Sequence, residues 1–197
     1  MTRHMRAAIE ESVDTHARTK DPQCVDLICD RECYADICEA AKRSGNAFVI
    51  GYVKLLIDTI NLKTFVRARK MGQPWSFFGT VFISGGDISE KVFVSGYEEP
   101  VAQFAARLEG TALKKAAEEG LASMKETGSF TDIERLCDDA LMDYVKDAKY
   151  ISFGIEPLIA YMAAKQAEIR CVRIVLAGKA AGLAPNLIRE RLRETYG

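Results

Sequence analysis

The stretch FGIEPLIAYMAAKQAEIR, residues 153–170, decides the fold expected for this chain. Its apolar residues recur at helical intervals, and Pro157 stands near the start, where the first turn of a helix tolerates proline. Arg173, Lys179 and the segment IRERLR at 188–193 continue the pattern toward the C-terminus. This end of the chain therefore predicts helices and carries no catalytic chemistry.

The composition is that of a folded protein without a strong charge. The chain has 197 residues, of which 48% are hydrophobic and 28% are charged, so it can bury a core in one or two domains. Its 27 basic and 28 acidic residues leave a formal net charge of −1. That balance provides no overall field for binding nucleic acid or an anionic membrane surface, so we expect no nucleic-acid partner.

The cysteines indicate reduced thiols rather than a disulfide framework. There is no Cys-x-x-Cys pair and no signal-like N-terminus, which favours a cytoplasmic protein. We expect the thiols to pack as small core hydrophobes. The six positions are Cys24, Cys29, Cys33, Cys38, Cys137 and Cys171.

The longest uncharged run is MGQPWSFFGTVFISGG, residues 71–86. It is shorter than the roughly 20 apolar residues that a spanning helix needs, and glycine and proline interrupt it, so we expect no direct membrane span. Its aromatic residues are expected to plug a core, because the Gly-Gln-Pro turn before them directs the chain back onto the preceding helix. They are Trp75, Phe77, Phe78 and Phe82.

A weak internal repeat relates the two halves of the chain. Cys29-Asp30 aligns with Cys137-Asp138, and the residues around each pair keep their order. Each repeat reads as a lead-in helix, a second helix after an aspartate, and a long helix that ends at glycine. We therefore predict an all-α fold of tandem helical lobes related by this repeat, with domains at 1–96 and 97–197.

Periodicity and breaking residues predict the positions of the helices. The predicted ranges are 3–18, 31–43, 47–70, 88–94, 99–108, 112–126, 131–148, 155–178 and 186–196. Thr131 and Glu134 form a capping box that predicts one helix start. Residues 80–83 have strand propensity but no second strand to pair with, so we expect loop or helix there.

Matching apolar stripes mark the two longest predicted helices. The first stripe comprises Phe48, Tyr52, Leu55, Leu62 and Val66, and the second comprises Leu158, Met162, Ile169, Val172 and Leu176. Gln166 and Arg173 lie beside the second stripe. We expect both to be semi-buried and hydrogen-bonded between helices.

No motif in the sequence supplies an active site. His4 and His16 lie about three turns apart on one predicted helix, so we expect solvated side chains rather than a metal site. The spacings of 5, 4 and 5 between the first four cysteines match no zinc or iron–sulfur pattern. There is no GxxxxGK[ST], GxSxG or HExxH motif, and Gly178-Lys179 lacks the rest of a phosphate-binding loop. We therefore predict that the protein is not an enzyme and has no catalytic, cofactor-binding or metal-binding residue. A cofactor or thiol enzyme that uses the cysteines from Cys24 to Cys38 is a further alternative.

Basic residues gather near the C-terminus. Taken alone, they are ordinary exposed ions worth tenths of a kcal/mol each. Contact with another subunit becomes an expectation only through a family resemblance. The candidate subunit-interface residues are then Arg170, Arg173, Lys179, Arg189 and Arg193.

The C-terminal part of the chain closely resembles the C subunit of V-type and A-type ATPases, a relative of the eukaryotic d subunit. The resemblance is carried by the pattern FGxEPLxAY at 153–161, followed in order by K, EI, R, GK, G and the segment IRERLR at 188–193. Three further blocks are similar to the same family and stand in the correct order: CDRECY at 29–34, LLIDTINLKTFVRAR at 55–69 and FISGG at 82–86. Gln166 is a departure, because relatives often carry Glu there. Several such blocks in order are more specific than any one of them.

The resemblance implies an architecture and a set of partners. Members of this family have three similar helical lobes that form a funnel, cap the membrane rotor ring and receive the central shaft. Two repeats imply about two of those three lobes, with roughly the N-terminal one absent. The exposed inter-lobe surface then predicts self-association of the chain.

The resemblance also implies a function. It indicates a non-catalytic central-stalk subunit that couples the rotating shaft to the membrane rotor ring, in proton or sodium transport or in ATP synthesis. Such a subunit is cytoplasmic and peripheral to the membrane, and its partners are the central shaft subunits and the rotor ring. The alternative is a free-standing α-helical scaffold that binds a partner outside any ATPase.

Overall fold

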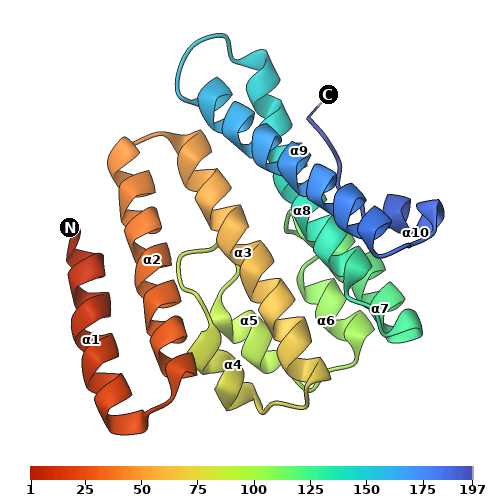
Figure 1. Ribbon diagram of the computed structural model, residues 1–197. Coiled ribbons are helices and arrows are strands. Elements are labelled where there is room, and N and C mark those ends of the chain that lie inside the picture. The colour runs from red at the N-terminus through yellow and green to blue at the C-terminus, as the bar shows by residue number, and fades with distance from the viewer. Residues whose placement is uncertain (197) are drawn as a thin grey trace. The chain divides into compact units, whose positions relative to one another are not determined.

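The computed structural model describes residues 1–196 and contains helices joined by turns and loops, with no strand in that range (Figure 1). This confirms the all-α prediction. The chain divides into two compact units, Met1–Glu98 and Glu99–Gly197. That the two units are copies of one repeat stays a prediction.

The first unit is built from three long helices and two short ones (Figure 1). The three long helices lie side by side in chain order. Each begins at a side-chain cap, because Thr2, Asp21 and Asn46 each accept a hydrogen bond from a backbone N–H of the first turn. The helices are α1 (Arg3–Thr19), α2 (Pro22–Ser44), α3 (Ala47–Lys70), α4 (Trp75–Val81) and α5 (Glu90–Ser95).

Helix α2 begins at Pro22, whereas the sequence predicts a start at residue 31. Asp21 accepts a hydrogen bond from the N–H of Gln23, and Pro22 takes the first helical position, where a missing N–H leaves no bond unmade. The Asp-Pro pair therefore starts a helix instead of forming a break. Helix α3 has the predicted bounds, 47–70.

An aromatic cluster fills part of the core of the first unit. The ring of Phe65 on α3 lies 5.5 Å from Phe78 of α4, 5.4 Å from Phe93 of α5 and 5.4 Å from Tyr97. The three phenylalanines are fully buried, and two of the contacts are edge-to-face, a favourable geometry for aromatic rings. The expectation of a core plug is right for Phe78 but wrong for Trp75, which is 55% exposed.

Two buried polar residues of α3 fasten the loop between α4 and α5. The Asn61 side chain donates to the carbonyl of Ile83 (2.8 Å) and accepts from the N–H of the same residue (2.9 Å). The Asp58 carboxylate accepts from the N–H groups of Asp87 (3.0 Å) and Ile88 (3.1 Å). Side chains of α3 thus satisfy backbone groups that a neighbouring strand would otherwise pair.

These contacts explain why the strand-prone segment 80–83 forms no strand. Helix α4 ends at Val81, and the next backbone groups bond to Asn61. Gly86 then lies so close to Asp58 that a Cβ atom would collide with the carboxylate. Burial raises the pKa of Asp58 to about 6, and the two backbone hydrogen bonds act in the opposite direction.

We expect Asp58→Ala to lower the free energy of unfolding by about 1–3 kcal/mol, because it leaves two backbone N–H groups without their acceptor. Urea denaturation followed by circular dichroism measures the change. Asp87→Ala is the matched control, since the exposed Asp87 side chain pairs with Lys54 at the surface and the substitution leaves the backbone N–H of residue 87 in place. Equal stability of the two variants would contradict this account of the loop.

His4 attaches α1 to α2. Its Nδ1 lies 2.8 Å from a carboxylate oxygen of Glu32, and its Nε2 lies 3.1 Å from one of Glu39. The hydrogen bond to Glu32, with a further contribution from Glu39, raises the pKa of His4, and the same bond lowers the pKa of Glu32. The expectation of solvated histidines is wrong for His4, whereas His16 is exposed.

A raised pKa means that the stabilising contribution of His4 is complete below its ordinary value of 6.5 and is lost as the pH rises through the folded-state value. We therefore expect the midpoint temperature of thermal unfolding to decrease as the pH is raised from about 6 to about 9. His4→Gln should flatten that fall, and His16→Gln should keep it. Calorimetry across this range measures both variants, and identical profiles for the two would contradict the assignment to His4.

The second unit is assembled around α8 (Figure 1). Its fully buried side chains include Phe104, Leu108, Leu113, Ile133 and Val145. Helix η1 is a π-helical turn, and Gly120 at its end lies so near α8 that an added Cβ would stand 2.8 Å from the Cα of Ile133. The elements are α6 (Val101–Arg107), η1 (Ala116–Gly120), α7 (Leu121–Thr127), α8 (Thr131–Lys146), the 3₁₀ turn η2 (Asp147–Tyr150), α9 (Glu156–Ala180) and α10 (Pro185–Glu190).

The predicted capping box at the start of α8 is wrong. Thr131 is the first helical residue rather than the cap, and Phe130 precedes it without a side-chain cap. The hydroxyl of Ser129 instead accepts a hydrogen bond from the N–H of Thr131 (3.2 Å). A serine two residues upstream therefore satisfies the N–H of Thr131 at the helix start.

No disulfide joins the cysteines within residues 1–196. Cys137 is buried in the core of the second unit, but Cys29 and Cys33 are exposed on α2, so the expectation of core packing is wrong for these two. Across residues 1–196, no group of three or more His, Cys, Asp or Glu side chains is placed to hold a metal ion. None of the helices described is both long enough and apolar enough to cross a membrane.

Candidate functional site

Helix α9 has small residues at its buried positions and a line of large apolar residues on the opposite, exposed face. Ala160, Ala164 and Gly178 are its buried positions. At Gly178 the approach of α10 is so close that a Cβ would lie 2.7 Å from the Cγ1 of Ile188. The outer face comprises Leu158, Met162, Ile169, Val172 and Leu176, each between 51% and 61% exposed. We call these five residues the α9 stripe.

The α9 stripe is the second of the two stripes found in the sequence, and the structure places the two in different environments. On α3, Leu55, Leu62 and Val66 are buried. On α9, the whole stripe is exposed because the opposite face makes the contacts with the rest of the unit. Ala160, Ala164 and Gly178 are buried on that face, and Ile174 and Val175 are half-buried there. Gln166 and Arg173 are exposed as well, so the expectation that they are semi-buried is wrong.

The sequence contains a signal that would have revealed this orientation. Ala160, Ala164 and Gly178 recur at helical spacing on the side opposite the stripe. Small residues at such positions permit close helix packing, so they identify the inner face of α9, while the apolar periodicity alone identifies only an apolar face.

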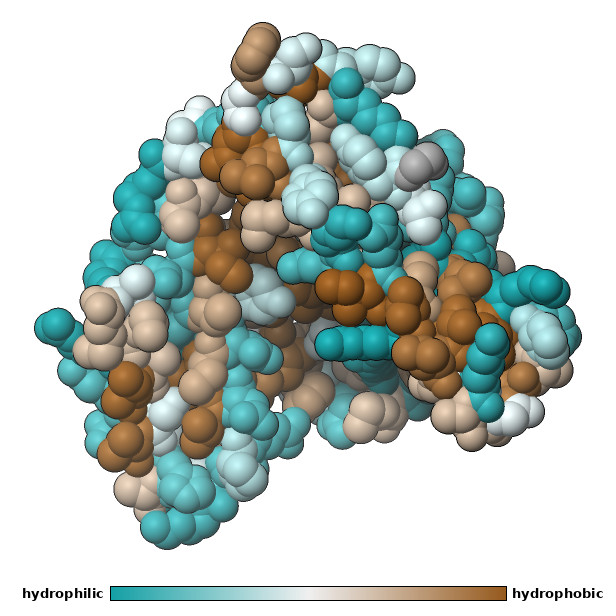
Figure 2. All heavy atoms as spheres, turned by 45° about the horizontal axis from the view of Figure 1, so that its top comes forward, coloured by the Kyte–Doolittle hydropathy of each residue, from teal (hydrophilic) through white to brown (hydrophobic). Residues whose placement is uncertain are grey.

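The exposed apolar surface begins before α9. Tyr150 and Phe153 are 88% and 91% exposed, and Ile151 and Ile155 are also exposed. Figure 2 shows hydrophobic side chains gathered along the course of α9. A contiguous apolar surface of this kind on a folded protein marks a site of interaction with another protein or a membrane.

Charged side chains border the α9 stripe unevenly. In the first half of the helix, Lys165 pairs with Glu168 (2.7 Å) and lies over the ring of Tyr161 at 5.7 Å. From residue 169 to residue 180 the helix contains no acidic residue, and Arg173 and Lys179 are exposed there. The C-terminal half of the stripe is therefore flanked by positive charge alone.

The five basic residues that the sequence proposed for a subunit interface divide into two groups. The guanidinium of Arg170 donates to Asp138 of α8 (2.7 Å), and that of Arg193 donates to the same oxygen (2.9 Å). Arg173, Lys179 and Arg189 are exposed and make no ion pair within residues 1–196. The interface role of all five stays a prediction.

The segment after α10 is held against α8, which corrects the prediction of a helix over 186–196. Helix α10 ends at Glu190. The backbone N–H of Glu194 then donates to Asp139 (2.8 Å), the Glu194 carboxylate accepts from Lys146, and Lys149 lies 4.8 Å from the ring of Tyr196. These contacts with α8 and η2 replace the helical hydrogen bonds expected there.

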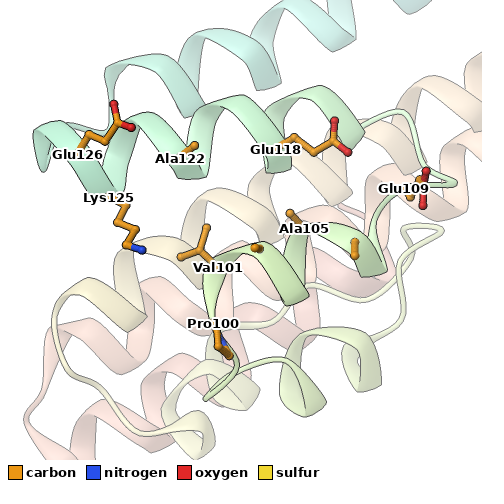
Figure 3. A pocket seen from close by; sticks show the side chains of 10 residues that line it. Pro100, Val101, Ala105, Glu109, Glu118, Ala122, Lys125 and Glu126 are labelled. Atoms are coloured by element: carbon orange, nitrogen blue, oxygen red, sulfur yellow. The ribbon is translucent and has the colours of Figure 1, made fainter.

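A groove of about 700 Å³ lies between α6 and α7 (Figure 3). Its lining is mostly small and apolar, with Val101, Ala105 and Ala122 among the residues that face it. Glu109, Glu118, Lys125 and Glu126 line it as well, and Glu109 pairs with Lys114 (3.3 Å). Three glutamates and one lysine therefore supply the charges of the groove lining.

A smaller hollow of about 280 Å³ in the first unit explains why three of the sequence blocks belong together. Tyr34 comes from the block at 29–34, Thr64 and Arg67 come from the block at 55–69, and Phe82 and Ile83 come from the block at 82–86. The fold therefore joins three separated segments around one place.

A second line of exposed apolar residues runs along α1. Met5, Ile9 and Val13 are 52–63% exposed at intervals of one helical turn, and Figure 2 shows hydrophobic side chains along this helix. The opposite side of α1 packs on α2 through Ser12 and His4. This line is shorter than the α9 stripe.

The family of the chain follows from comparison with known proteins. A family model described as the ATP synthase (C/AC39) subunit matches residues 2–191. The chain belongs to this family. The match extends over both compact units and confirms the resemblance found in the sequence blocks.

Curated relatives in the C/AC39 family carry matching names. The C subunit of the V-type sodium ATPase of Enterococcus hirae is 25% identical over 88% of this chain and 52% of its own length. The C subunits of the A-type ATP synthases of Halobacterium salinarum and Methanobrevibacter smithii are 24% and 28% identical, over 78% and 75% of this chain and 44% and 41% of their own lengths. The chain thus spans about half the length of these relatives. No solved structure gives a significant match.

We expect Arg193→Ala to lower the free energy of unfolding by about 1–3 kcal/mol, because Arg193 and Asp138 are 11% and 12% exposed and the substitution removes a charged hydrogen bond between them. Arg173→Ala is the matched control and should change it by less than about 0.5 kcal/mol, because Arg173 is exposed on α9. Urea denaturation measures both changes. A larger loss for Arg173→Ala would show that the structural role of the two arginines is reversed.

Proposed function

We propose that this chain works as a non-catalytic central-stalk subunit of a V/A-type ATPase, where it couples the rotating shaft to the membrane rotor ring in proton or sodium transport or in ATP synthesis. Membership of the C/AC39 family over residues 2–191 is the observation that carries the proposal. The names of the relatives, which are subunits of a sodium ATPase and of ATP synthases, support it.

The physical properties of the chain suit a part that transmits force. Close-packed helical cores have low compressibility, so a torque applied to one face of such a unit reaches the other with little deformation. Long helices such as α3 and α9, of 24 and 25 residues, provide the stiff elements. A coupling part also needs surfaces for its neighbours, and the exposed α9 stripe is the most extended apolar surface in the second unit.

The proposal assigns partners and a location. The central shaft subunits and the membrane rotor ring are the proposed partners, and the chain is placed in the cytoplasm, peripheral to the membrane. Arg173, Lys179 and Arg189 are the exposed members of the proposed interface set. Self-association of the chain, through its exposed inter-lobe surface, is proposed as well. The alternative of a free-standing scaffold is disfavoured, because a match over nearly the whole chain links it to an ATPase subunit family.

The proposal is tested by mixing the chain with purified central-shaft subunits and following co-elution on gel filtration. We expect a complex with the wild-type chain and at least about tenfold weaker binding of Val172→Asp, because a charge would be buried in an apolar contact. Met71→Asp is the control, since Met71 is 70% exposed but lies outside the α9 stripe, and its binding should be unchanged.

Loss of co-elution in both variants would point to a general defect, which circular dichroism would reveal. Co-elution of Val172→Asp at wild-type strength would remove the α9 stripe from the interface. The coupling role itself would be contradicted if deletion of the gene left membrane-attached, ion-coupled ATPase activity unchanged.

A further inference from the structure

The outer face of α9 has a stricter spacing than burial in a globular core requires. Seven residues of this face follow one another at alternating intervals of four and three residues. Five of them are the α9 stripe, and the other two are lysines. The series is Leu158, Met162, Lys165, Ile169, Val172, Leu176 and Lys179, and all seven are exposed. This is the a/d pattern of a coiled-coil seam, maintained along nearly the full length of the helix.

Such a seam specifies the kind of partner. In a straight α-helix, a strict seven-residue repeat drifts by about 20° per heptad, so the seam stays in contact only with another helix that winds around it with a left-handed supercoil. Helix α9 has 25 residues and is about 37 Å long, enough to seat a helix of several turns. A flat surface or a short loop would not need this spacing.

Charge complementarity specifies the partner further. The first half of the seam is locally neutral, because Lys165 pairs with Glu168. The second half is bordered by Arg173 and Lys179, without any acidic residue from 169 to 180. We infer that the outer face of α9 binds a partner α-helix with an apolar heptad seam and with acidic residues along the portion that lies against Arg173 and Lys179. This inference rests on the proposed function, because it names the partner of the same surface.

A synthetic helix tests the inference. The probe is a fluorescein-labelled peptide of about four heptads, with leucine at a and d and glutamate at e and g, which repels its own copies. A second peptide with lysine at e and g is the control for charge. By fluorescence anisotropy with the full chain, we expect the acidic peptide to bind at least about tenfold more tightly than the basic one.

Three variants of the chain locate the contact. Val172→Asp should weaken the acidic peptide at least about tenfold by interrupting the seam. The double variant Arg173→Glu with Lys179→Glu should weaken it about as much. The matched double variant Lys125→Glu with Arg191→Glu changes the same charge at exposed positions outside α9 and outside the proposed interface set, and it should bind as the wild type does. Equal binding of the two peptides, or a wild-type affinity after charge reversal on α9, would overturn the inference.

A second copy of the chain is the competing occupant. Sedimentation velocity distinguishes the two occupants. A wild-type dimer that Val172→Asp dissociates, together with no binding of the acidic peptide, would assign the face to self-association and overturn the inference.

The shaft co-elution experiment separates this outcome from failure of the proposed function. If charge reversal on α9 leaves co-elution with the shaft subunits intact while Val172→Asp abolishes it, the proposed function is supported and the inference of an acidic partner helix is overturned. If the peptide binds as expected but the shaft subunits do not, the inference stands without the proposed function.

Discussion

The division of α9 into a small inner face and a large outer face is the constraint on which the second unit depends. Alanine and glycine at the inner positions let α9 approach α8 and α10 closely, and Gly178 against Ile188 leaves no room for a Cβ atom. The five large apolar side chains of the α9 stripe, which would fill a core in most helices, lie on the other face and are left outside. A surface of this kind reaches its lowest free energy only when another apolar surface covers it.

Helix α3 shows the opposite solution in the first unit. It is buried along much of its C-terminal half, and it places two polar side chains, Asp58 and Asn61, among apolar neighbours. Both are tolerated because each satisfies two backbone groups of the loop that crosses them. The burial that raises the pKa of Asp58 to about 6 is thus tied to the position of one loop.

The helices of this fold could be predicted from local sequence, but the environment of each helix could not. Asn46 and Gly72 bracket α3 so clearly that its predicted bounds, 47–70, are those observed. Apolar periodicity located the stripe on α9 equally well, yet burial depends on what packs against a helix, which periodicity does not encode. His4 was misjudged for the same reason, because its partner Glu32 lies on another helix and far away in sequence. The family blocks succeeded where single residues failed, since several segments in the correct order carry the signature of a whole fold.

The π-helical turn at Ala116–Gly120 gives the second unit a built-in phase change. A turn closed by bonds from i to i+5 accommodates one residue more than the regular helix, so every side chain after it is rotated by about 100° from the direction it would otherwise take. Leu121 is consequently directed into the core, and Ala122 faces the groove beside α6. The length of this single turn, rather than the identity of any one side chain, determines which residues of α7 belong to the interior and which remain available at the surface.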